Sequence, residues 1–218
     1  MISVDVCIIG GGPAGMTAAA IAANRGLTVA LLDERPSAGG QIYRGLEDGP
    51  FRNDLSLGPD YNLGLRIFER FKAAQKQAFF GVNIWRVDMF GDEGFVSFSK
   101  EGTSQRLKFV KLILATGAME RPMAFEGWTL PGVMTVGGAQ LLLKSSGIAP
   151  GGRIVLAGNG PLLLLFASQL IGMGVRIAAI LDTTPKVNKT AIALRHLRSI
   201  ISNRAKIAKG LRMIWERR

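Results

Sequence analysis

Cysteine and histidine, which most often hold metals or carry redox and acid–base chemistry, are almost missing from this chain. Its 218 residues include one cysteine, Cys7, and one histidine, His196. A single thiol excludes a disulfide framework, a redox-active cysteine pair and a cysteine-based metal centre. His196 lies in a basic stretch between Arg195 and Arg198, which is typical of a solvated surface residue. We therefore predict no metal site, and the sequence identifies no catalytic residue.

Acidic residues are also few, and the imbalance is local. The chain carries 27 Lys and Arg against 16 Asp and Glu, a formal charge of +11. Residues 186–218 hold ten of these cations and one acid, Glu216, so this segment alone accounts for +9. A basic segment attracts nucleic acids and anionic membranes. Its only aromatic side chain is Trp215, so we expect no nucleic-acid binding and leave membrane association as the less favoured alternative.

Export and membrane signals are missing as well. No basic region precedes the first apolar run, which itself contains glycines, so we expect no signal peptide and a cytoplasmic location. Residues 154–175 are uncharged and long enough to span a bilayer. Their glycines and internal proline instead favour a strand, a turn and a helix.

Glycine is abundant, and three of the 28 glycines have the spacing of a dinucleotide-binding fingerprint. Gly10, Gly12 and Gly15 form G-x-G-x-x-G directly after the apolar run 6–9 and directly before the helix-forming run 14–24. The first glycine permits a tight turn, the second lets the backbone approach a pyrophosphate, and the third lets the helix pack on the sheet. This context predicts a phosphate-binding turn; a turn that merely connects strand and helix is the alternative.

An acidic strand end completes the fingerprint. Residues 29–33 predict a second strand, and Asp33 at its end stands eighteen residues after Gly15. A carboxylate there accepts hydrogen bonds from a ribose diol, while the unpaired N–H groups at the helix N-terminus favour the phosphates. Glu34 is the neighbouring alternative for the ribose.

Two further glycine-containing segments are predicted to approach the same ligand. Residues 34–59 form a long connection of the kind that is often functional, and within it residues 39–44 read Gly-Gly-Gln-Ile-Tyr-Arg. We expect backbone N–H groups, Gln41 and Arg44 to supply donors, with a simple turn as the alternative. The second segment, residues 115–117, follows a predicted strand as Ala-Thr-Gly and indicates another close backbone approach.

Between these segments the apolar spacing predicts one helix and three strands. The helix covers residues 62–78, with basic and acidic residues on its outer side. The strands cover residues 82–87, 95–98 and 107–114, and the turn-rich residues 88–94 join the first two. We predict an antiparallel three-strand excursion.

The strand–glycine–helix pattern then returns in a weaker form. The predicted elements are a strand, a helix and a second strand, over residues 153–157, 162–172 and 175–181. Gly158 and Gly160 match the first two glycines of the fingerprint, and Asp182 follows the last strand, but Leu163 replaces the third glycine. Whether this unit binds a dinucleotide is left open.

These elements predict an α/β protein with two units and a tail. Residues 1–125 form a Rossmann-like domain that contains the antiparallel excursion, and residues 126–185 form a second, incomplete Rossmann-like domain. Residues 186–218 form a basic tail, in which apolar residues at three- and four-residue steps predict an amphipathic helix over residues 189–215. We expect its apolar side to pack on a partner or a second copy; loose docking on the chain and membrane binding are the alternatives.

Together the motifs resemble the flavoproteins with two dinucleotide-binding domains, in which FAD occupies the first domain and a pyridine nucleotide the second. Within that group the chain resembles the A (α) subunits of heteromeric dehydrogenases, such as octopine and nopaline oxidase, D-hydroxyproline dehydrogenase and the cyanide-forming glycine dehydrogenase. The resemblance rests on DERP and GGQIYR in residues 33–44, ATGAMERP in 115–122, LPGV in 130–133 and LAGNGPLL in 156–163.

The resemblance implies a set of cofactor-binding residues. FAD would be lined by Gly10, Gly12, Pro13, Ala14, Gly15, Asp33, Glu34, Arg35, Gly40, Gln41, Ala115, Thr116 and Gly117. NAD(P) or another adenine nucleotide would lie beside Gly158 and Gly160.

The resemblance also implies a function. The chain would be an FAD-dependent oxidoreductase subunit that relays electrons in the oxidation of an amino-acid-derived amine of the opine, hydroxyproline or glycine class. The amine itself would be bound by a β-type flavoprotein partner. The lack of catalytic residues agrees with this, because the flavin supplies the redox chemistry. The family's subunits continue well beyond the position of Asp182, so we expect a truncated chain, with a non-catalytic nucleotide-binding or assembly module as the alternative.

Overall fold

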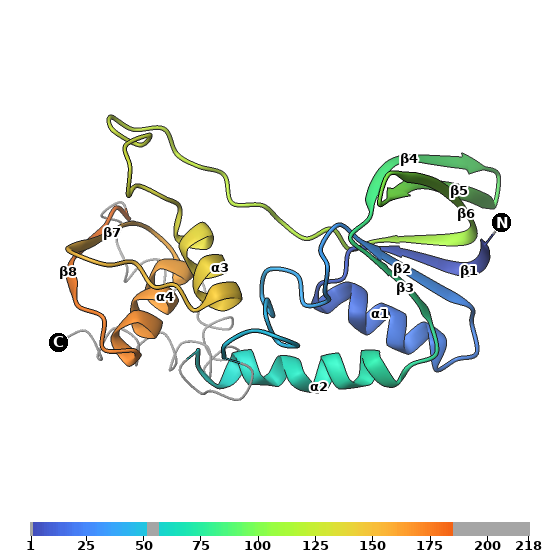
Figure 1. The fold of residues 1–218 in the computed structure, drawn as a ribbon, viewed down its shortest axis with the longest axis horizontal. Coiled ribbons are helices and arrows are strands. Elements are labelled where there is room, and N and C mark those ends of the chain that lie inside the picture. The colour runs from blue at the N-terminus through green and yellow to red at the C-terminus, as the bar shows by residue number, and fades with distance from the viewer. Residues whose placement is uncertain (1, 52–56, 185–218) are drawn as a thin grey trace, which may run out of the picture. The chain divides into compact units, whose positions relative to one another are not determined.

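The computed structural model in Figure 1 describes residues 2–51 and 57–184. The chain divides into two compact units, one made of residues 1–121 and 144–147, the other of residues 122–143 and 148–218. The described part of each unit has its own sheet, six-stranded in the first and two-stranded in the second. The domain limits predicted at residues 125 and 185 stay predictions.

A mixed sheet with the order β3-β2-β1-β6-β5-β4 forms the first unit. Its strands are β1 (Ile2–Ile9), β2 (Val29–Asp33), β3 (Gln77–Phe80), β4 (Asn83–Phe90), β5 (Glu93–Lys100) and β6 (Thr103–Leu114). Strand β1 pairs in parallel with β2 and β6, and β2 pairs in parallel with β3. Strands β4, β5 and β6 pair antiparallel. The predicted α/β class and the three-strand excursion are confirmed.

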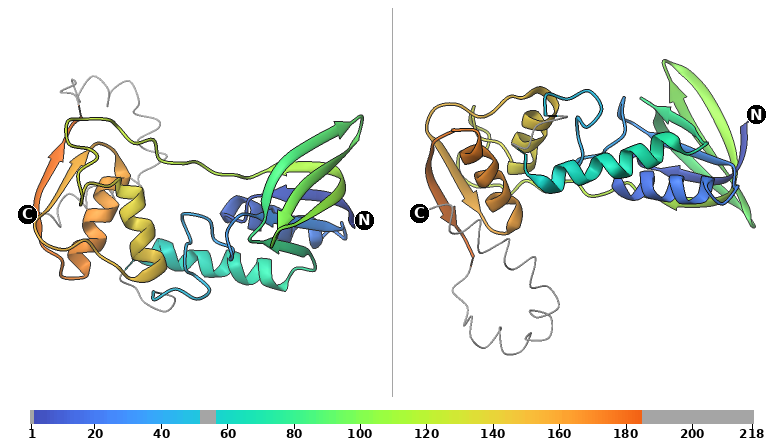
Figure 2. Two further views of the ribbon diagram at one scale, coloured as in Figure 1. Left: turned by 45° about the horizontal axis from the view of Figure 1, so that its top comes forward. Right: turned by 90° about the horizontal axis from the view of Figure 1, so that it is seen from below.

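Both faces of this sheet are covered. Helices α1 (Pro13–Ala23) and α2 (Pro59–Ala73) lie together on one face, as the views of Figures 1 and 2 agree. Their side of the core includes the buried Ile8, Met16, Leu31, Phe68 and Phe71. On the other face the antiparallel strands pack back over the parallel ones, and the buried side chains there include Leu32, Val96, Phe98, Leu107 and Phe109.

The prediction of a helix over residues 62–78 was wrong at the C-terminal end. Helix α2 ends at Ala73 because Ala74 adopts an extended conformation, with φ −73° and ψ 140°. Residues 77–80 then form β3, an edge strand beside β2. Phe79 packs into the core under the antiparallel strands and Phe80 into the core under the helices, the two-residue alternation of a strand.

The second unit repeats the strand–helix–strand pattern. Strands β7 (Ile154–Gly158) and β8 (Ile177–Asp182) pair in parallel, and helix α4 (Pro161–Gly172) connects them. The strand, turn and helix predicted for residues 154–175 are confirmed, and no helix among the described residues is both long and apolar enough to cross a bilayer. Helix α3 (Val136–Ser146) was not predicted; Gln140 donates a buried hydrogen bond of 2.9 Å from its side-chain amide to Gln169 of α4.

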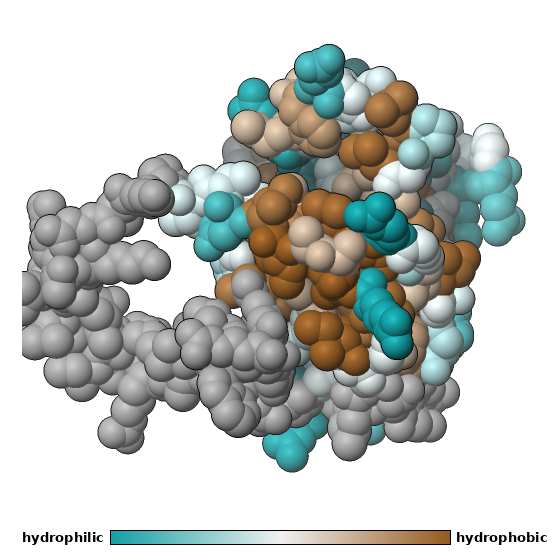
Figure 3. All heavy atoms as spheres, turned by 90° about the vertical axis from the view of Figure 1, so that its left-hand side faces the viewer, coloured by the Kyte–Doolittle hydropathy of each residue, from teal (hydrophilic) through white to brown (hydrophobic). Residues whose placement is uncertain are grey.

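The outer face of the β7–β8 pair is apolar and exposed in the described part of the chain. The β-sheet register places Val155, Ala157, Ala179 and Leu181 on this face, and Val155 and Leu181 are 55% and 53% exposed. Figure 3 shows apolar side chains gathered on this side of the second unit. The basic tail over residues 186–218, with the amphipathic helix predicted for 189–215, lies outside the described residues.

The aromatic core of the first unit generates a stability prediction. Phe98 is fully buried and contacts Phe79 with ring centroids 5.5 Å apart, so Phe98→Ala should lower the free energy of unfolding by about 3–5 kcal/mol. Phe90, 62% exposed in the same sheet, is the matched control, and Phe90→Ala should cost less than about 1 kcal/mol. Urea unfolding followed by circular dichroism measures both, and equal losses would contradict the assignment of this core.

Candidate functional site

The turn between β1 and α1 is built from close backbone contacts. Gly10 has φ +110°, a conformation that side chains disfavour, and a Cβ there would overlap the carbonyl oxygen of Ala115. A Cβ on Gly15 would overlap the carbonyl oxygen of Gly10. These two glycines therefore let α1 and the segment after β6 pack directly against the end of β1. Their roles in the turn and in helix packing agree with the fingerprint.

Gly12 differs from the other two glycines. Its backbone is ordinary, with φ −73°, and the nearest atom to a Cβ at this position is the Cα of Gly40 at 3.8 Å. The protein itself therefore has room for a Cβ at residue 12. The space in front of Gly12 belongs to a cavity instead.

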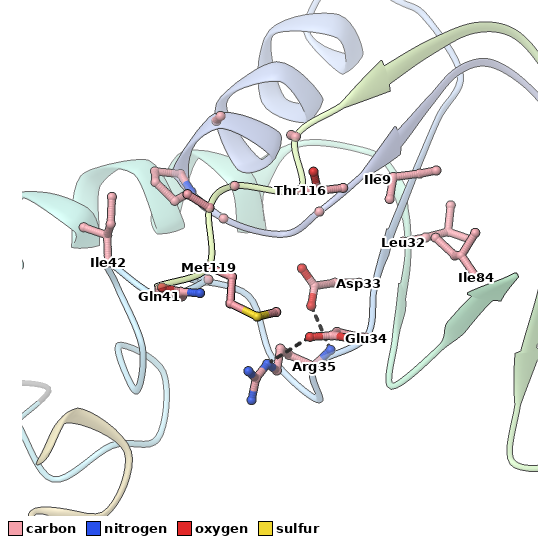
Figure 4. Close-up of a pocket in the computed structure, with 18 of the residues that line it drawn as sticks. Ile9, Leu32, Asp33, Glu34, Arg35, Gln41, Ile42, Ile84, Thr116 and Met119 are labelled. Atoms are coloured by element: carbon pink, nitrogen blue, oxygen red, sulfur yellow. Dashed lines mark hydrogen bonds and ion pairs between the residues drawn. The ribbon is translucent and has the colours of Figure 1, made fainter. Parts of the chain in front are cut away.

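This cavity has a volume of about 740 Å³ and lies entirely in the first unit. It opens where the parallel strands β1, β2, β3 and β6 end, which is where ligands bind in open α/β sheets. Its volume is in the usual range for ligand pockets, roughly 300–1,000 Å³. Figure 4 shows the acidic end of β2 between an apolar end, with Ile9, Leu32 and Ile84, and an end that carries Gln41 and Met119.

Most of the residues predicted from the sequence meet in this cavity. The predicted residues that line it are Gly10, Gly12, Pro13, Ala14, Asp33, Glu34, Arg35, Gly40, Gln41, Ala115, Thr116 and Gly117. Gly15 lies behind the turn, where it packs on Gly10. Gly158 and Gly160 lie in the second unit.

The acidic end of β2 is tied to the glycine turn. The carboxylate of Asp33 accepts hydrogen bonds from the backbone N–H of Gly11 and, at 2.7 Å, from the backbone N–H of Arg35. Glu34 lines the same cavity with a side chain that is 72% exposed, and it forms an ion pair of 3.5 Å with Arg35 (Figure 4). The two adjacent carboxylates at the cavity therefore differ in their partners: Asp33 accepts hydrogen bonds from two backbone N–H groups, and Glu34 forms an ion pair with a side chain.

The loop of residues 39–44 closes another side of the cavity. The N–H of Gly39 donates to the carbonyl of Gly11 at 2.8 Å, and Nε of Arg44 donates to the carbonyl of Gly40 at 3.0 Å. Gly40 has φ +60°, and a Cβ there would lie 2.8 Å from the Cα of Gly12. Burial lowers the pKa of the Arg44 guanidinium, Arg35 lowers it further, and the nearby carboxylates oppose both effects. An arginine remains a cation under these conditions.

Sequence reasoning missed the apolar wall of the cavity. Leu32, Val82 and Ile84 line it together, although Leu32 lies near the end of β2, Val82 just before β4 and Ile84 at the start of β4. Each of them has the pattern of an ordinary strand residue, so no local signal distinguishes them. Their meeting depends on the backbone hydrogen bond from Val82 N–H to the carbonyl of Asp33, at 3.1 Å, which joins the two strand ends.

The arrangement can hold a molecule with an anionic centre, hydroxyl groups and a flat apolar ring. Helix α1 has no acidic residue in its first turn and no side-chain cap on its N-terminus, so its first N–H groups and positive dipole end are available to an anion. Carboxylates beside them accept hydrogen bonds from hydroxyl groups. The apolar wall suits a hydrophobic ring.

The second glycine turn has different contacts. Gly158 and Gly160 have φ +144° and +94°, and a Cβ on Gly158 would lie 3.4 Å from the side chain of Leu163, which is buried. Asp182 accepts a hydrogen bond of 2.9 Å from the backbone N–H of Thr184. Leu163, which stands in place of the third glycine, therefore packs beside the first glycine of this turn. Binding of a nucleotide by the second unit stays a prediction.

Cys7 lies in the middle of β1 and is fully buried among apolar side chains. Burial raises the pKa of its thiol to about 12. The thiolate is the reactive form of cysteine, so Cys7 has the properties of a small core residue.

Comparison with known sequences identifies a family and several relatives of this chain. The chain matches the family model described as pyridine nucleotide-disulphide oxidoreductase over residues 4–217. The A subunit of opine oxidase from Rhizobium meliloti is 41% identical over 213 residues, which are 97% of this chain and 46% of that protein. A hydrogen cyanide synthase subunit of Pseudomonas protegens is 37% identical over 88% of this chain and 42% of its own. The chain spans about half the length of these relatives.

Solved structures agree on the fold. L-proline dehydrogenase from P. horikoshii matches with a TM-score of 0.65 and 26% identity, over 83% of this chain and 35% of that chain. Bacillithiol disulfide reductase from Staphylococcus aureus shares the fold, with a TM-score of 0.58 and 18% identity over 94% of this chain and 65% of that chain. The Rossmann-like fold inferred from the sequence is confirmed.

The environment of Cys7 leads to a prediction about thiol reactivity. Because its pKa of about 12 leaves the thiol protonated at pH 8, a disulfide reagent such as dithionitrobenzoate should not modify the native protein within an hour at that pH. After denaturation one thiol per chain should react. The released reagent thiolate, which absorbs visible light, measures both states. Rapid modification of the native protein would contradict the burial of Cys7.

Proposed function

Because the chain belongs to the pyridine nucleotide-disulphide oxidoreductase family, we propose that its first unit binds FAD through the adenosine diphosphate half, as part of an FAD-dependent oxidoreductase. The observation that carries the proposal is the space in front of Gly12. The uncapped start of α1, the acidic end of β2 and the loop around Gly40 all line this space, which no described side chain of the first unit fills.

The lining of the cavity supports one orientation of the cofactor. The pyrophosphate belongs at the N-terminus of α1 beside Gly12, where backbone N–H groups and the helix dipole stabilise it. The adenosine ribose would then lie at the end of β2, and the adenine would lie against Leu32, Val82 and Ile84. Figure 4 shows Leu32 and Ile84 close together at that end of the cavity. Gln41 and the segment of residues 115–119, which also line the cavity, would hold the isoalloxazine.

The residues of this chain act by binding and orienting rather than by acid–base catalysis. When bound, the flavin supplies the redox chemistry, accepting and donating electrons. The buried thiol of Cys7 contributes no dithiol chemistry despite the family's name. Among the described residues, the charged groups of the cavity are Asp33, Glu34, Arg35 and Arg44, which surround the adenosine half.

The likeness to the A subunit of opine oxidase and to a hydrogen cyanide synthase subunit supports a reaction class. The alpha subunit of sarcosine oxidase from Corynebacterium, 27% identical over 87% of this chain and 20% of its own, points the same way. All three are named as subunits. We therefore infer that the chain works with a second flavoprotein subunit of the β type, which oxidises an amino-acid-derived amine, and that the chain relays its electrons.

The alternative is a nucleotide-binding or assembly module without activity of its own. The chain covers less than half of each of these relatives. NAD(P) or another adenine nucleotide at Gly158 and Gly160 stays a prediction in either case.

Gly12→Val tests cofactor binding with little effect on the fold. The nearest protein atom leaves room for the new Cβ, so the melting temperature of the cofactor-free protein should change by no more than about 2 °C. The valine side chain would occupy the pyrophosphate position, so FAD binding should weaken at least about 100-fold. Gly151→Val, in the second unit with open space around it, is the control and should bind like the parent. Titration of flavin fluorescence measures the affinities. Equal affinity of Gly12→Val and parent would overturn the proposal.

A dye-reduction assay separates the two functions. Co-expressed with the amine-oxidising subunit of an opine oxidase, the chain should co-purify with it and reduce a dye on addition of an opine, and Gly12→Val should abolish the reduction by this pair. If the partner subunit reduces the dye equally well alone, with the parent chain and with Gly12→Val, the result supports the module without activity.

A further inference from the structure

A second, smaller cavity in the first unit carries side chains of both charges. Its volume is about 200 Å³, and all of its lining residues belong to that unit. The polar side chains in the lining are those of Arg35, Ser37, Arg44, Asp48 and Ser145. We propose that this cavity binds a small zwitterion of the α-amino acid class, with the carboxylate held by the two arginines and the ammonium group held by Asp48.

Arg35 and Arg44 form the cationic wall of the cavity. Nε of Arg44 donates to the carbonyl of Gly40 at 3.0 Å, and in the described part of the chain no acidic side chain forms an ion pair with this guanidinium. Burial lowers the pKa of Arg44 and the neighbouring Arg35 lowers it further, because the two cations repel each other. A carboxylate bound between them relieves this repulsion, and a guanidinium can give it two parallel hydrogen bonds.

Asp48 forms the anionic wall. It lines the same cavity as both arginines, yet within residues 2–51 and 57–184 it makes no ion pair with either of them or with another cation. Opposite charges that share a small cavity without touching leave a gap that a ligand can bridge. A simple anion would meet the like charge of Asp48, whereas a zwitterion presents the complementary charge to each wall. The charge pattern therefore favours an amino acid over phosphate or a bare carboxylate.

Backbone contacts hold both walls in place without a ligand. The N–H of Gly49 donates to the carbonyl of Gly45 at 2.8 Å, and a Cβ on Gly49 would overlap that carbonyl oxygen, so Asp48 lies in a tight turn. On the cationic side, the hydroxyl of Tyr61 donates to the backbone carbonyl of Arg44. A preformed cavity loses little conformational entropy on binding, so a small ligand keeps more of its contact energy as affinity.

The size of the cavity restricts the ligand further. Pockets for drug-sized ligands and cofactors span roughly 300–1,000 Å³, so a cavity of about 200 Å³ admits a molecule of only a few heavy atoms. The hydroxyl groups of Ser37 and Ser145 add neutral donors and acceptors to the lining. Arg35 and Arg44 also line the larger cavity, but the proposal does not require a cofactor there.

Calorimetric titration of the cofactor-free full chain with three small molecules tests the proposal. L-alanine carries both charges, propionate lacks the ammonium group, and ethylamine lacks the carboxylate. The parent should bind one L-alanine per chain, at least about threefold more tightly than propionate and about tenfold more tightly than ethylamine. The second ratio is larger because an exposed ion pair contributes less than a paired contact between guanidinium and carboxylate.

Two variants separate the two walls. Asp48→Asn should lower the affinity for L-alanine to that for propionate. Arg35→Gln should weaken both ligands alike, about tenfold, and keep the preference for L-alanine; the backbone N–H of residue 35, which donates to Asp33, is retained. Asp92→Asn, an exposed acid in the turn between β4 and β5, is the matched control and should bind like the parent. Arg35 and Asp48 are exposed, so neither change should alter the melting temperature.

The outcomes are distinct. A parent that gives no saturable heat with L-alanine, or binds L-alanine and propionate equally, overturns the proposal, and so does inorganic phosphate that binds more tightly than L-alanine. An unchanged preference in Asp48→Asn contradicts the role of Asp48. Saturating FAD should leave one L-alanine bound, and its displacement would place L-alanine in the larger cavity and overturn the proposal. A parent that binds L-alanine but no FAD contradicts the proposed function alone.

Discussion

The site depends on direct contact between backbones at the carboxyl ends of β1 and β6, with no side chain between them. A methyl group on Gly10 would overlap the carbonyl of Ala115, and one on Gly15 would overlap the carbonyl of Gly10. The strand end, the helix start and the segment after β6 therefore touch through their backbones. This contact fixes where α1 begins and which way its first N–H groups point. The anion-binding character of the cavity and the open space beside Gly12 both follow from that direction.

Hydrogen bonds then hold the remaining walls against this turn. Asp33 accepts from Gly11, and Gly39 donates to the carbonyl of Gly11, so one residue of the turn anchors both the end of β2 and the loop that follows it. Arg44 secures the same loop through the carbonyl of Gly40. Each bond contributes only about 1 kcal/mol to stability, but together they set the walls before a ligand arrives. A preformed site loses less conformational entropy on binding, so more of the contact energy appears as affinity.

Local chemistry in the sequence was enough to predict the turn and its flanking elements, and the family resemblance completed the prediction of most of the lining residues. Strand β3 was missed because Ala74 and Ala78 continue the apolar spacing of α2, whereas the strand is defined by pairing with β2. The apolar wall around Leu32 and Ile84 was missed for a related reason, since it exists only where distant strand ends meet. The hydrogen bonds of Asp33 could not be read either, although the extra glycine at position 11 was a signal of its contact.

The two glycine turns have similar spacing but different surroundings in the described part of the chain. In both units a parallel strand, a glycine turn and a helix follow one another, and in both a strand ends in an aspartate. In the first unit four parallel strands end around one space, and Asp33 reaches back to the turn. In the described part of the second unit only two strands meet, and Asp182 bonds to Thr184 just beyond its own strand. The space for a nucleotide therefore comes from the convergence of strand ends, and the glycines only allow the backbone to approach it.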